Sequence, residues 1–350
     1  MPFFTPRWLE IGHAKIDIFE AFFGNMGENM EKERKLAVVA LGGNALLRDN
    51  QRGTIEEQEA NVTATLIHML FLIEEGYDLV ITHGNGPQVG SLLMQNDAGE
   101  ELHGIPQMPL NICVAETQGE IGFMIERMLR NILIEKGMDK AILTLITQVV
   151  VDEKDPAFNN PTKRIGRTYS KEQADKMAAE KGWVFKESSK SSEGWRRVVA
   201  SPMPKEIFNR DTIGRIARRG AIVIAGGGGG IPVYKDKEGK VRTVDAVIDK
   251  DFASSLLASR IGADEFYILT DVPFVYRNFG EDNEEKMEFI DNKDGQTMLD
   301  SGAFGEGSMA PKVRAALYFI NHGGDKSVIT EATKLDDRSC GTKITMEYEN

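Results

Sequence analysis

Leu36 to Leu47 reads LAVVALGGNALL, and this stretch decides the fold. Its first six residues are small or branched apolar residues that do not alternate with polar ones, which predicts a strand buried on both faces. The run breaks at Gly42-Gly43-Asn44 and resumes with a helical pattern. Glycine lets backbone amides approach a ligand, and a following helix directs free N–H groups and its positive dipole end to the same place. The stretch therefore predicts an anion site, most simply for phosphate, although Gly-Gly turns also close ordinary strand–helix junctions.

A second strand, turn and helix follow in the same order. A helical pattern runs from about Glu56 to Glu75, Gly76 ends it, and the apolar run Tyr77 to Thr82 leads into the turn His83-Gly84-Asn85-Gly86-Pro87. Open α/β sheets bind ligands at the carboxyl ends of their parallel strands. The repeat therefore strengthens the prediction of a ligand site. His83 itself has a simpler alternative interpretation, in which it only caps or hydrogen-bonds nearby backbone.

The second half of the chain repeats this architecture. The strand Ala221 to Ala225 precedes five glycines, Gly226 to Gly230, whose entropic cost we explain by close backbone approach to a ligand. A helix over Phe252 to Arg260 follows Asp251, and a strand over Phe266 to Thr270 comes next. The loop Gly305 to Arg314 places Lys312 in the first turns of a helix, where a cation opposes the dipole and requires an anionic partner.

Composition excludes several classes of protein. The 350 residues are 41% hydrophobic and 27% charged, as expected for an ordinary globular protein, and a net charge of −12 argues against a nucleic-acid surface. Cys113 and Cys340 form neither a disulfide framework nor a zinc motif, which favours reduced thiols, Cys113 being buried, in a cytoplasmic protein. No apolar run reaches the length of about 20 residues that spans a bilayer. There is no GxxxxGK[ST] motif, and the acidic partner of a dinucleotide fold is not evident.

Three segments stand apart from this pattern. Residues 1–34 are expected to form an extension, either a short amphipathic helix on the body or an overextended start with initiation at Met26 or Met30. The apolar stripe of a helix over Cys113 to Glu135 indicates core or a dimer interface, and Ala141 to Val151 predicts a strand. Residues 152–204 are Ser-rich and basic and predict an inserted lid, in which Lys163 belongs either to the site or to a solvated loop.

Five motifs, in order along the chain, resemble those of the carbamate kinases, which belong to the amino acid kinase family. The likeness runs from about Lys35 to Ile344. Two departures are visible, Ala310 where the family usually has Gly, and Arg164 where it usually has Pro. The matching stretches are Ala40–Ala45, Thr82–Gly90, Asn160–Lys163, Asp245–Asp251 and Gly307–Val313.

The resemblance implies a fold and a reaction. The expected fold is α/β, a three-layer αβα sandwich around a mainly parallel sheet of about eight strands. The kinase domain is expected over residues 35–346, and within it the lid over 152–204 and the nucleotide-binding half over 205–346. The implied reaction is ATP + carbamate ⇌ carbamoyl phosphate + ADP with Mg²⁺, in a cytoplasmic homodimer that runs toward ATP synthesis in arginine or related fermentative catabolism. No nucleic-acid, membrane or direct metal-ligand role for the chain is implied.

The resemblance also assigns roles to residues. Lys163, Lys250 and Lys312 would neutralise phosphoryl charge, and Asp251 would orient these lysines. The phosphoryl group would be held at Gly42, Gly43 and Asn44, and carbamate at Gly84, Asn85 and Gly86. The nucleotide would contact Gly227, Gly228, Thr270, Asp271, Val272, Tyr276 and Met309, although Tyr276 and Met309 are equally explained as packing residues.

Two rival functions remain at this point. A sister kinase acting on another small acceptor would keep the first glycine turn and Asp251 but lack Asn160-Pro161-Thr162-Lys163. A non-catalytic sensor would have lost a lysine or Asp251, and none is missing. Fold alone does not separate these functions, whereas the lysines favour the enzyme.

Overall fold

The computed structural model describes residues 8–11, 14–17, 34–48, 51–187, 194–305 and 307–347. The chain forms two units, residues 1–34 and 35–350. In the first unit, β1 (Trp8–Ile11) pairs antiparallel with β2 (Ala14–Asp17). The alternative of a short amphipathic helix is therefore wrong for the residues of these two strands. Met26 and Met30, the alternative start positions, lie outside the described residues.

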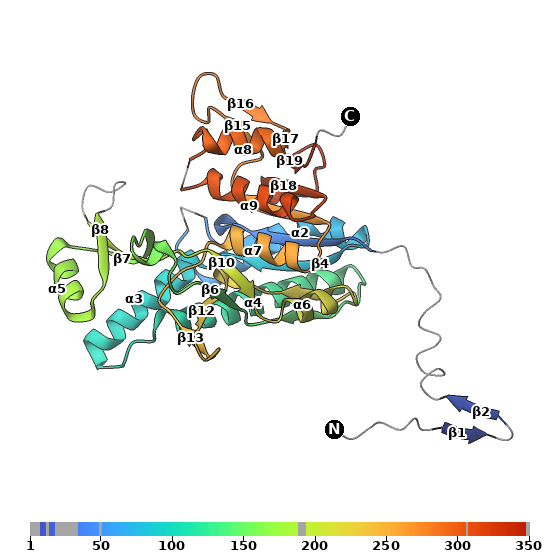
Figure 1. Cartoon of the computed structure of the whole chain (residues 1–350), viewed down its shortest axis with the longest axis horizontal. Coiled ribbons are helices and arrows are strands. Elements are labelled where there is room, and N and C mark those ends of the chain that lie inside the picture. Colours follow the sequence, from blue (N-terminus) through green and yellow to red (C-terminus); the bar gives the residue numbers. More distant parts are fainter. Residues whose placement is uncertain are drawn as a thin grey trace. The chain divides into compact units, whose positions relative to one another are not determined.

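An eight-stranded sheet forms the centre of the second unit (Figure 1). Its order is β17-β19-β18-β14-β3-β4-β11-β5, and every neighbouring pair is parallel except β18 and β19. The predicted mainly parallel sheet of about eight strands is confirmed. The strands are β3 (Leu36–Leu41), β4 (Asp78–His83), β5 (Ile142–Thr144), β11 (Ile222–Ile224), β14 (Glu265–Thr270), β17 (Phe289–Asp291), β18 (Lys326–Glu331) and β19 (Thr342–Thr345).

The side chains of β3 explain why its sequence is apolar throughout. Leu36, Val38 and Ala40 lie in one core cluster, and Ala37, Val39 and Leu41 lie in another on the opposite face. Helices cover both faces, so a strand of alternating polarity would bury polar groups. The first cluster includes α6 (Arg210–Ala217), α7 (Lys250–Arg260) and α9 (Met309–Asn321), and the second includes α2 (Ile55–Glu74) and α4 (Leu110–Glu135). The three-layer prediction is confirmed.

The apolar stripe of α4 belongs to the core. Ile121, Ile125 and Leu129 are 0% exposed, and they lie in the same cluster as the buried face of α2. The helix begins at Leu110, three residues before the predicted Cys113. The stripe is therefore used within one chain, and it no longer supports the expected dimer interface.

The predicted single strand Ala141 to Val151 is wrong, because the chain changes sheets within it. Strand β5 ends at Thr144, and β6 (Gln148–Val151) belongs to a second sheet of order β10-β6-β12-β13. At the junction, the Thr147 amide donates to Gln118 Oε1 at 2.7 Å, and the Gly226 amide donates to Thr147 Oγ1 at 2.9 Å. The other strands of this sheet are β10 (Pro204–Ile207), β12 (Ile231–Lys235) and β13 (Val241–Thr243).

The segment between β6 and β10 forms a separate small sheet with one helix, which we call the lid. Its strand order is β7-β9-β8, and Figure 1 shows it extending from the side of the main sheet beside α3 (Gly86–His103). The charged helix expected near Lys171 is α5, which begins with a capping box at Ser170 and ends at Gly182 in the left-handed conformation. The lid elements are β7 (Lys163–Tyr169), α5 (Lys171–Lys181), β8 (Val184–Glu187) and β9 (Trp195–Val199).

The remaining elements lie toward the C-terminus. Strands β15 and β16 form a hairpin, and α8 packs beside α9. Across the described part of the chain, no helix combines the length and the apolar character that crossing a membrane requires. These elements are β15 (Val275–Arg277), β16 (Glu285–Met287) and α8 (Asn292–Asp300).

Candidate active site

The carboxyl ends of β3, β4 and β14 meet at one edge of the main sheet, because neighbouring strands are parallel and in register. Strand β3 ends at Leu41, and Gly43–Ala45 forms a short 3₁₀ helix, η2. A Cβ on Gly42 would lie 2.4 Å from the Leu269 carbonyl oxygen of β14. Only glycine fits this close approach, so the Gly42 turn is set by the neighbouring strand. The side chain of Asn44 is outside the described part of the structure.

A cavity of about 650 Å³ opens beside this turn. That volume lies in the range of small-molecule and cofactor sites. It is lined by eight residues that the sequence predicted to bind phosphate or nucleotide: Gly42, Gly43, Thr270, Asp271, Val272, Tyr276, Met309 and Lys312. Sequence reasoning missed Asn278, Phe279 and Glu281 of the β15–β16 loop, which carries no motif, whereas Gly305, Gly307 and Ser308 come from the glycine loop already singled out.

Asp251 lies at the centre of the charged groups of the site. Its side chain is only 5% exposed in the first turn of α7. Lys250 Nζ donates to Asp251 Oδ1 at 2.5 Å, and Lys312 Nζ from the first turn of α9 donates to Oδ2 at 2.9 Å. Three of the four predicted catalytic residues therefore form one buried cluster, Lys250–Asp251–Lys312.

Burial and charge act in opposite directions within this cluster. Burial would raise the pKa of Asp251, but the charges and hydrogen bonds of Lys250 and Lys312 hold that pKa well below its ordinary value. Burial lowers the pKa of Lys250, and the positive charge of Lys312 lowers it further, whereas the Asp251 carboxylate counteracts both effects. Two ammonium groups are thus held together at one carboxylate, and the cluster carries a net positive charge suited to an anion.

The fourth predicted catalytic residue, Lys163, comes from the lid. It begins β7, and its Nζ lies 3.5 Å from Asp249 Oδ2. Asp249 is the N-cap of α7, and its Oδ1 accepts hydrogen bonds from the Asp251 and Phe252 amides. One carboxylate therefore caps the helix that carries Asp251 and also pairs with the lid lysine. Sequence reasoning missed Asp249, although an Asp before a helix is a common cap.

The predicted acceptor turn after β4 contains two buried polar side chains, His83 and Asn85. His83 Nδ1 donates to the Gly84 carbonyl oxygen at 2.8 Å. Burial lowers the pKa of His83 to about 4, and the nearby charge of Lys250 contributes in the same direction. Asn85 Nδ2 donates to Thr117 Oγ1 at 2.9 Å, and Gly86 begins α3. A Cβ on Gly84 would lie 3.3 Å from Lys250 Cδ, so the lysine side chain passes directly over the turn.

The five glycines that follow β11 pack against protein groups. A Cβ on Gly227 would lie 2.4 Å from the His83 ring, and a Cβ on Gly228 would lie 2.3 Å from Asn85 Nδ2. Gly229 makes a similar approach to the Ile248 carbonyl oxygen, at 2.5 Å. Packing on the acceptor turn is therefore enough to require glycine here, and the approach to a ligand stays a prediction. Gly227 and Gly228, predicted at the nucleotide, lie behind Gly84–Gly86 and outside the described lining of the 650 Å³ cavity.

Among the described residues, metal-ligating side chains do not gather at the site. Within the described ranges of the chain, no three His, Cys, Asp or Glu side chains are arranged to hold an ion. Both oxygens of Asp251 are already engaged by lysines.

Comparison with known proteins places the chain in a family. The amino acid kinase family matches residues 35–331. A carbamate kinase from Pyrococcus furiosus is 47% identical over 86% of this chain and 95% of its own, and one from Halobacterium salinarum is 46% identical over 88% and 97%. A solved carbamate kinase from Giardia lamblia, bound to AMP-PNP, superposes with a TM-score of 0.84 at 40% identity, over 89% of this chain and 98% of its own. The chain therefore belongs to the amino acid kinase family and, within it, to the carbamate kinases.

Proposed function

We propose that the chain catalyses reversible phosphoryl transfer between ATP and carbamate, giving carbamoyl phosphate and ADP. The observation that carries this proposal is the position of the Lys250–Asp251–Lys312 cluster. Lys312 lines the 650 Å³ cavity, and Lys250 passes over the Gly84 turn, so the cluster connects the two places where a donor and an acceptor would lie. The ATP analogue held by the Giardia relative supports a nucleotide in the cavity.

Phosphoryl transfer requires positioning and neutralisation of charge more than covalent chemistry. The backbone N–H groups of Gly42, Gly43 and Asn44 would hold the transferred phosphoryl group, and Thr270 to Val272, Tyr276 and Met309 would contact the nucleoside. Lys250 and Lys312 would neutralise the phosphate oxygens, and Asp251 holds both ammonium groups in place before substrate binds. The neutral ring of His83 and the side chain of Asn85 support the turn at which carbamate would bind.

The lid lysine would complete the charge around the transferred group. Lys163 is 42% exposed and pairs with Asp249, which leaves its ammonium group accessible next to the start of α7. None of the described residues that line the 650 Å³ cavity belongs to the lid. Nucleotide binding and delivery of Lys163 are therefore separable by mutation.

Magnesium would arrive with the nucleotide. Mg²⁺ keeps several waters and is commonly bound by substrate phosphates with few protein carboxylates, which agrees with a site where lysines occupy the buried carboxylate. The ion would contribute charge stabilisation on the phosphate oxygens. The protein residues position the phosphates, and we propose Mg²⁺–ADP and Mg²⁺–ATP as the substrate forms.

The cellular setting is part of the same proposal. We propose the direction of ATP synthesis, in arginine or related fermentative catabolism, because an acyl phosphate such as carbamoyl phosphate is a strong phosphoryl donor. Both cysteines are free, Cys113 buried and Cys340 partly buried, in keeping with a cytoplasmic protein. The exposed apolar side chains Phe123 and Ile134 on the outer face of α4 are available to a homodimer, for which light scattering is the test.

Formation of ATP from ADP and carbamoyl phosphate tests the proposal directly. Purified protein with Mg²⁺ is assayed with coupling enzymes that convert ATP formation into the signal of a dehydrogenase reaction. Acetyl phosphate is the alternative donor. Lys163→Ala should abolish most of the activity, whereas Lys171→Ala, a lid lysine that pairs with Asp175 on the exposed face of α5, should retain it. A folded protein that binds ADP yet forms no ATP from carbamoyl phosphate would instead be a sister kinase or a sensor.

A further inference from the structure

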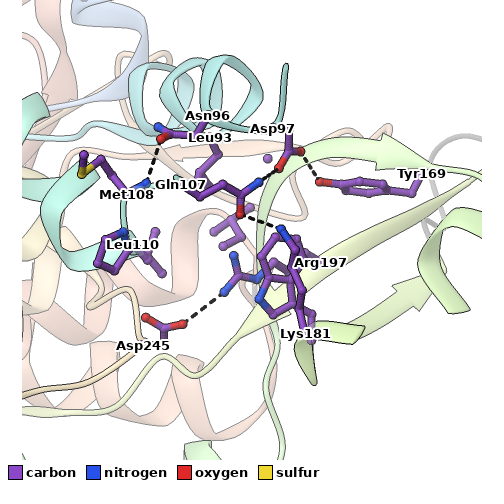
Figure 2. A pocket seen from close by; sticks show the side chains of 14 residues that line it. Leu93, Asn96, Asp97, Gln107, Met108, Leu110, Tyr169, Lys181, Arg197 and Asp245 are labelled. Carbon is purple, nitrogen blue, oxygen red and sulfur yellow. Dashed lines mark hydrogen bonds and ion pairs between the residues drawn. The ribbon is translucent and has the colours of Figure 1, made fainter. Parts of the chain in front are cut away.

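A second polar cluster lies between the lid and α3, away from the Lys250–Asp251–Lys312 cluster. Its side chains other than Arg167 line a cavity between α3, the start of α4 and the lid strands (Figure 2). The volume of this cavity is about 290 Å³. Contacts around the rim of this cavity join the lid to α3. The cluster consists of Asp97, Gln107, Arg167, Tyr169 and Lys181.

Asp97 on α3 is the centre of the cluster. Its Oδ2 accepts a hydrogen bond from the Tyr169 hydroxyl at 2.8 Å, and Arg167 Nε lies 3.6 Å from the same oxygen. Its Oδ1 accepts from Gln107 Nε2 at 2.7 Å. The other end of Gln107 accepts from Lys181 Nζ at 2.9 Å, so Asp97 engages three lid residues directly or through one amide (Figure 2).

The apolar part of the lid interface is small. Ile165 and Val199 are the fully buried lid residues of the apolar cluster shared with α3 and α4. Burial and hydrogen bonding to Asp97 both raise the pKa of Tyr169, so its hydroxyl remains a donor throughout the neutral range. The Asp97 contacts therefore join the outer end of the lid to α3, together with the ion pair of Lys181 and Glu100 at 2.6 Å.

Strand β7 connects this docking point to the active site. Tyr169 ends the strand and Lys163 begins it, and both ends pair with β9. At its inner end, Lys163 Nζ meets Asp249 beside Asp251. A lid that is released from Asp97 is held by fewer contacts at its outer end, and Lys163 then leaves Asp249 for a larger part of the time.

We infer that Asp97 is a positioning residue for the phosphoryl-transfer reaction, because its contacts with Tyr169, Arg167 and Gln107 seat Lys163 at the active site. This inference rests on the proposed function and adds to it a residue far from the reacting atoms. Asp97 touches neither of the two predicted substrate sites. It acts by setting the fraction of molecules in which the lid is docked.

Asp97→Asn tests the inference with little change of shape. The amide presents N–H groups to donors and removes the charge opposite Arg167, so we expect kcat to fall about tenfold, the size of losing one hydrogen bond to a charged group. The Kd for ADP should remain within about twofold, because no described lining residue of the nucleotide cavity lies in the lid. Asp175→Asn, which removes a carboxylate from the exposed face of the same lid, is the matched control and should change neither quantity.

A double-mutant cycle separates positioning from general destabilisation. If Asp97 acts through Lys163, then Asp97→Asn should lower kcat by less than about twofold in a Lys163→Ala background. An undiminished tenfold loss there would overturn the inference, as would an unchanged kcat in Asp97→Asn alone. Tyr169→Phe removes a single donor and should lower kcat about threefold, which provides the test if Asp97→Asn does not fold.

Amide hydrogen exchange provides a readout that does not depend on activity. Asp97→Asn should speed exchange in β7 and β9 and leave α2 and α4 unchanged, because only the lid is released. Unchanged exchange in β7 and β9 would overturn the docking role. If the wild-type chain forms no ATP from carbamoyl phosphate, the proposed function fails, whereas the exchange experiment still decides whether Asp97 docks the lid.

Discussion

Replacing Asp251 with Asn perturbs the site at its electrostatic centre. The substitution keeps the shape of the side chain but removes the one negative charge between Lys250 and Lys312, whose Nζ atoms lie 2.5 and 2.9 Å from its oxygens. The carboxylate is 5% exposed and the two lysine side chains are 17% and 16% exposed, so water screens little of the resulting repulsion. Breaking a buried pair in this way costs about 3–5 kcal/mol.

The same change should alter the protonation of Lys250. Burial and Lys312 already lower the pKa of Lys250, and Asp251 is the main group that raises it, with a smaller contribution from Asp249. Without the carboxylate, Lys250 loses its proton more readily, which relieves repulsion but removes a charge from the phosphoryl site. We therefore expect Asp251→Asn to lower kcat by at least about 100-fold, the scale of losing one charge-stabilising donor.

Urea unfolding and the coupled ATP assay measure both effects. Unfolding free energies of wild type, Asp251→Asn and the surface control Asp175→Asn are compared at pH 7, and the control should lose less than about 1 kcal/mol. The loss in Asp251→Asn should shrink as pH rises, because Lys250, whose pKa is lowered, no longer repels Lys312 once it has lost its proton. A free energy of unfolding within about 1 kcal/mol of wild type, together with a kcat within tenfold, would falsify the view that Asp251 holds a buried pair of charged lysines.

Three further predictions follow from particular contacts. Lys312→Ala should lower turnover by at least about 100-fold, and wild-type turnover in a folded variant would remove this lysine from the mechanism. The pKa of His83 is lowered to about 4 from about 6.5, so the folded state favours the neutral ring; this stability is present above pH 6.5 and is lost as pH falls toward 4. Between pH 7 and 5, wild type should therefore lose about 2 kcal/mol more than His83→Gln in urea unfolding, and parallel profiles would contradict it. Gly228→Ala should destabilise the protein by about 1–3 kcal/mol more than Gly104→Ala, because φ is +65° and +66° at the two positions but only Gly228 faces a side chain at 2.3 Å. Thermal unfolding of the two variants compares them, and equal losses would show that backbone strain alone matters.

Local pattern in the sequence predicted the parts of the fold that depend on burial and on backbone dihedral angles. The uninterrupted apolar run Leu36 to Leu41 predicted a strand covered on both faces, and β3 indeed contributes alternate residues to two cores. Helix α5 has the predicted limits, and its cap Ser170 and its closing Gly182 directly flank it in the chain. Signals of this kind act over a few residues, so one sequence contains them in full.

Contacts between distant residues were less accessible from the sequence. Asp251 and Lys250 are neighbours, but Lys312 is 61 positions away, and nothing in its local sequence shows that it shares the same carboxylate. The resemblance to carbamate kinases, rather than any residue pattern, placed these residues in one site. The route of the chain around the sheet brings the start of α9 beside the start of α7.

The sequence by itself therefore determined the central sheet, the glycine turns at its carboxyl edge and the set of charged residues available there. Tertiary structure alone decided that Ala141 to Val151 divides between two sheets, that Gly227 and Gly228 pack on His83 and Asn85, and that Asp97 holds the lid. The physical reason is the range of the interactions. Periodicity and capping depend on residues that are close together in the chain. Close approach and charge pairing depend on which distant segments meet when the core is buried.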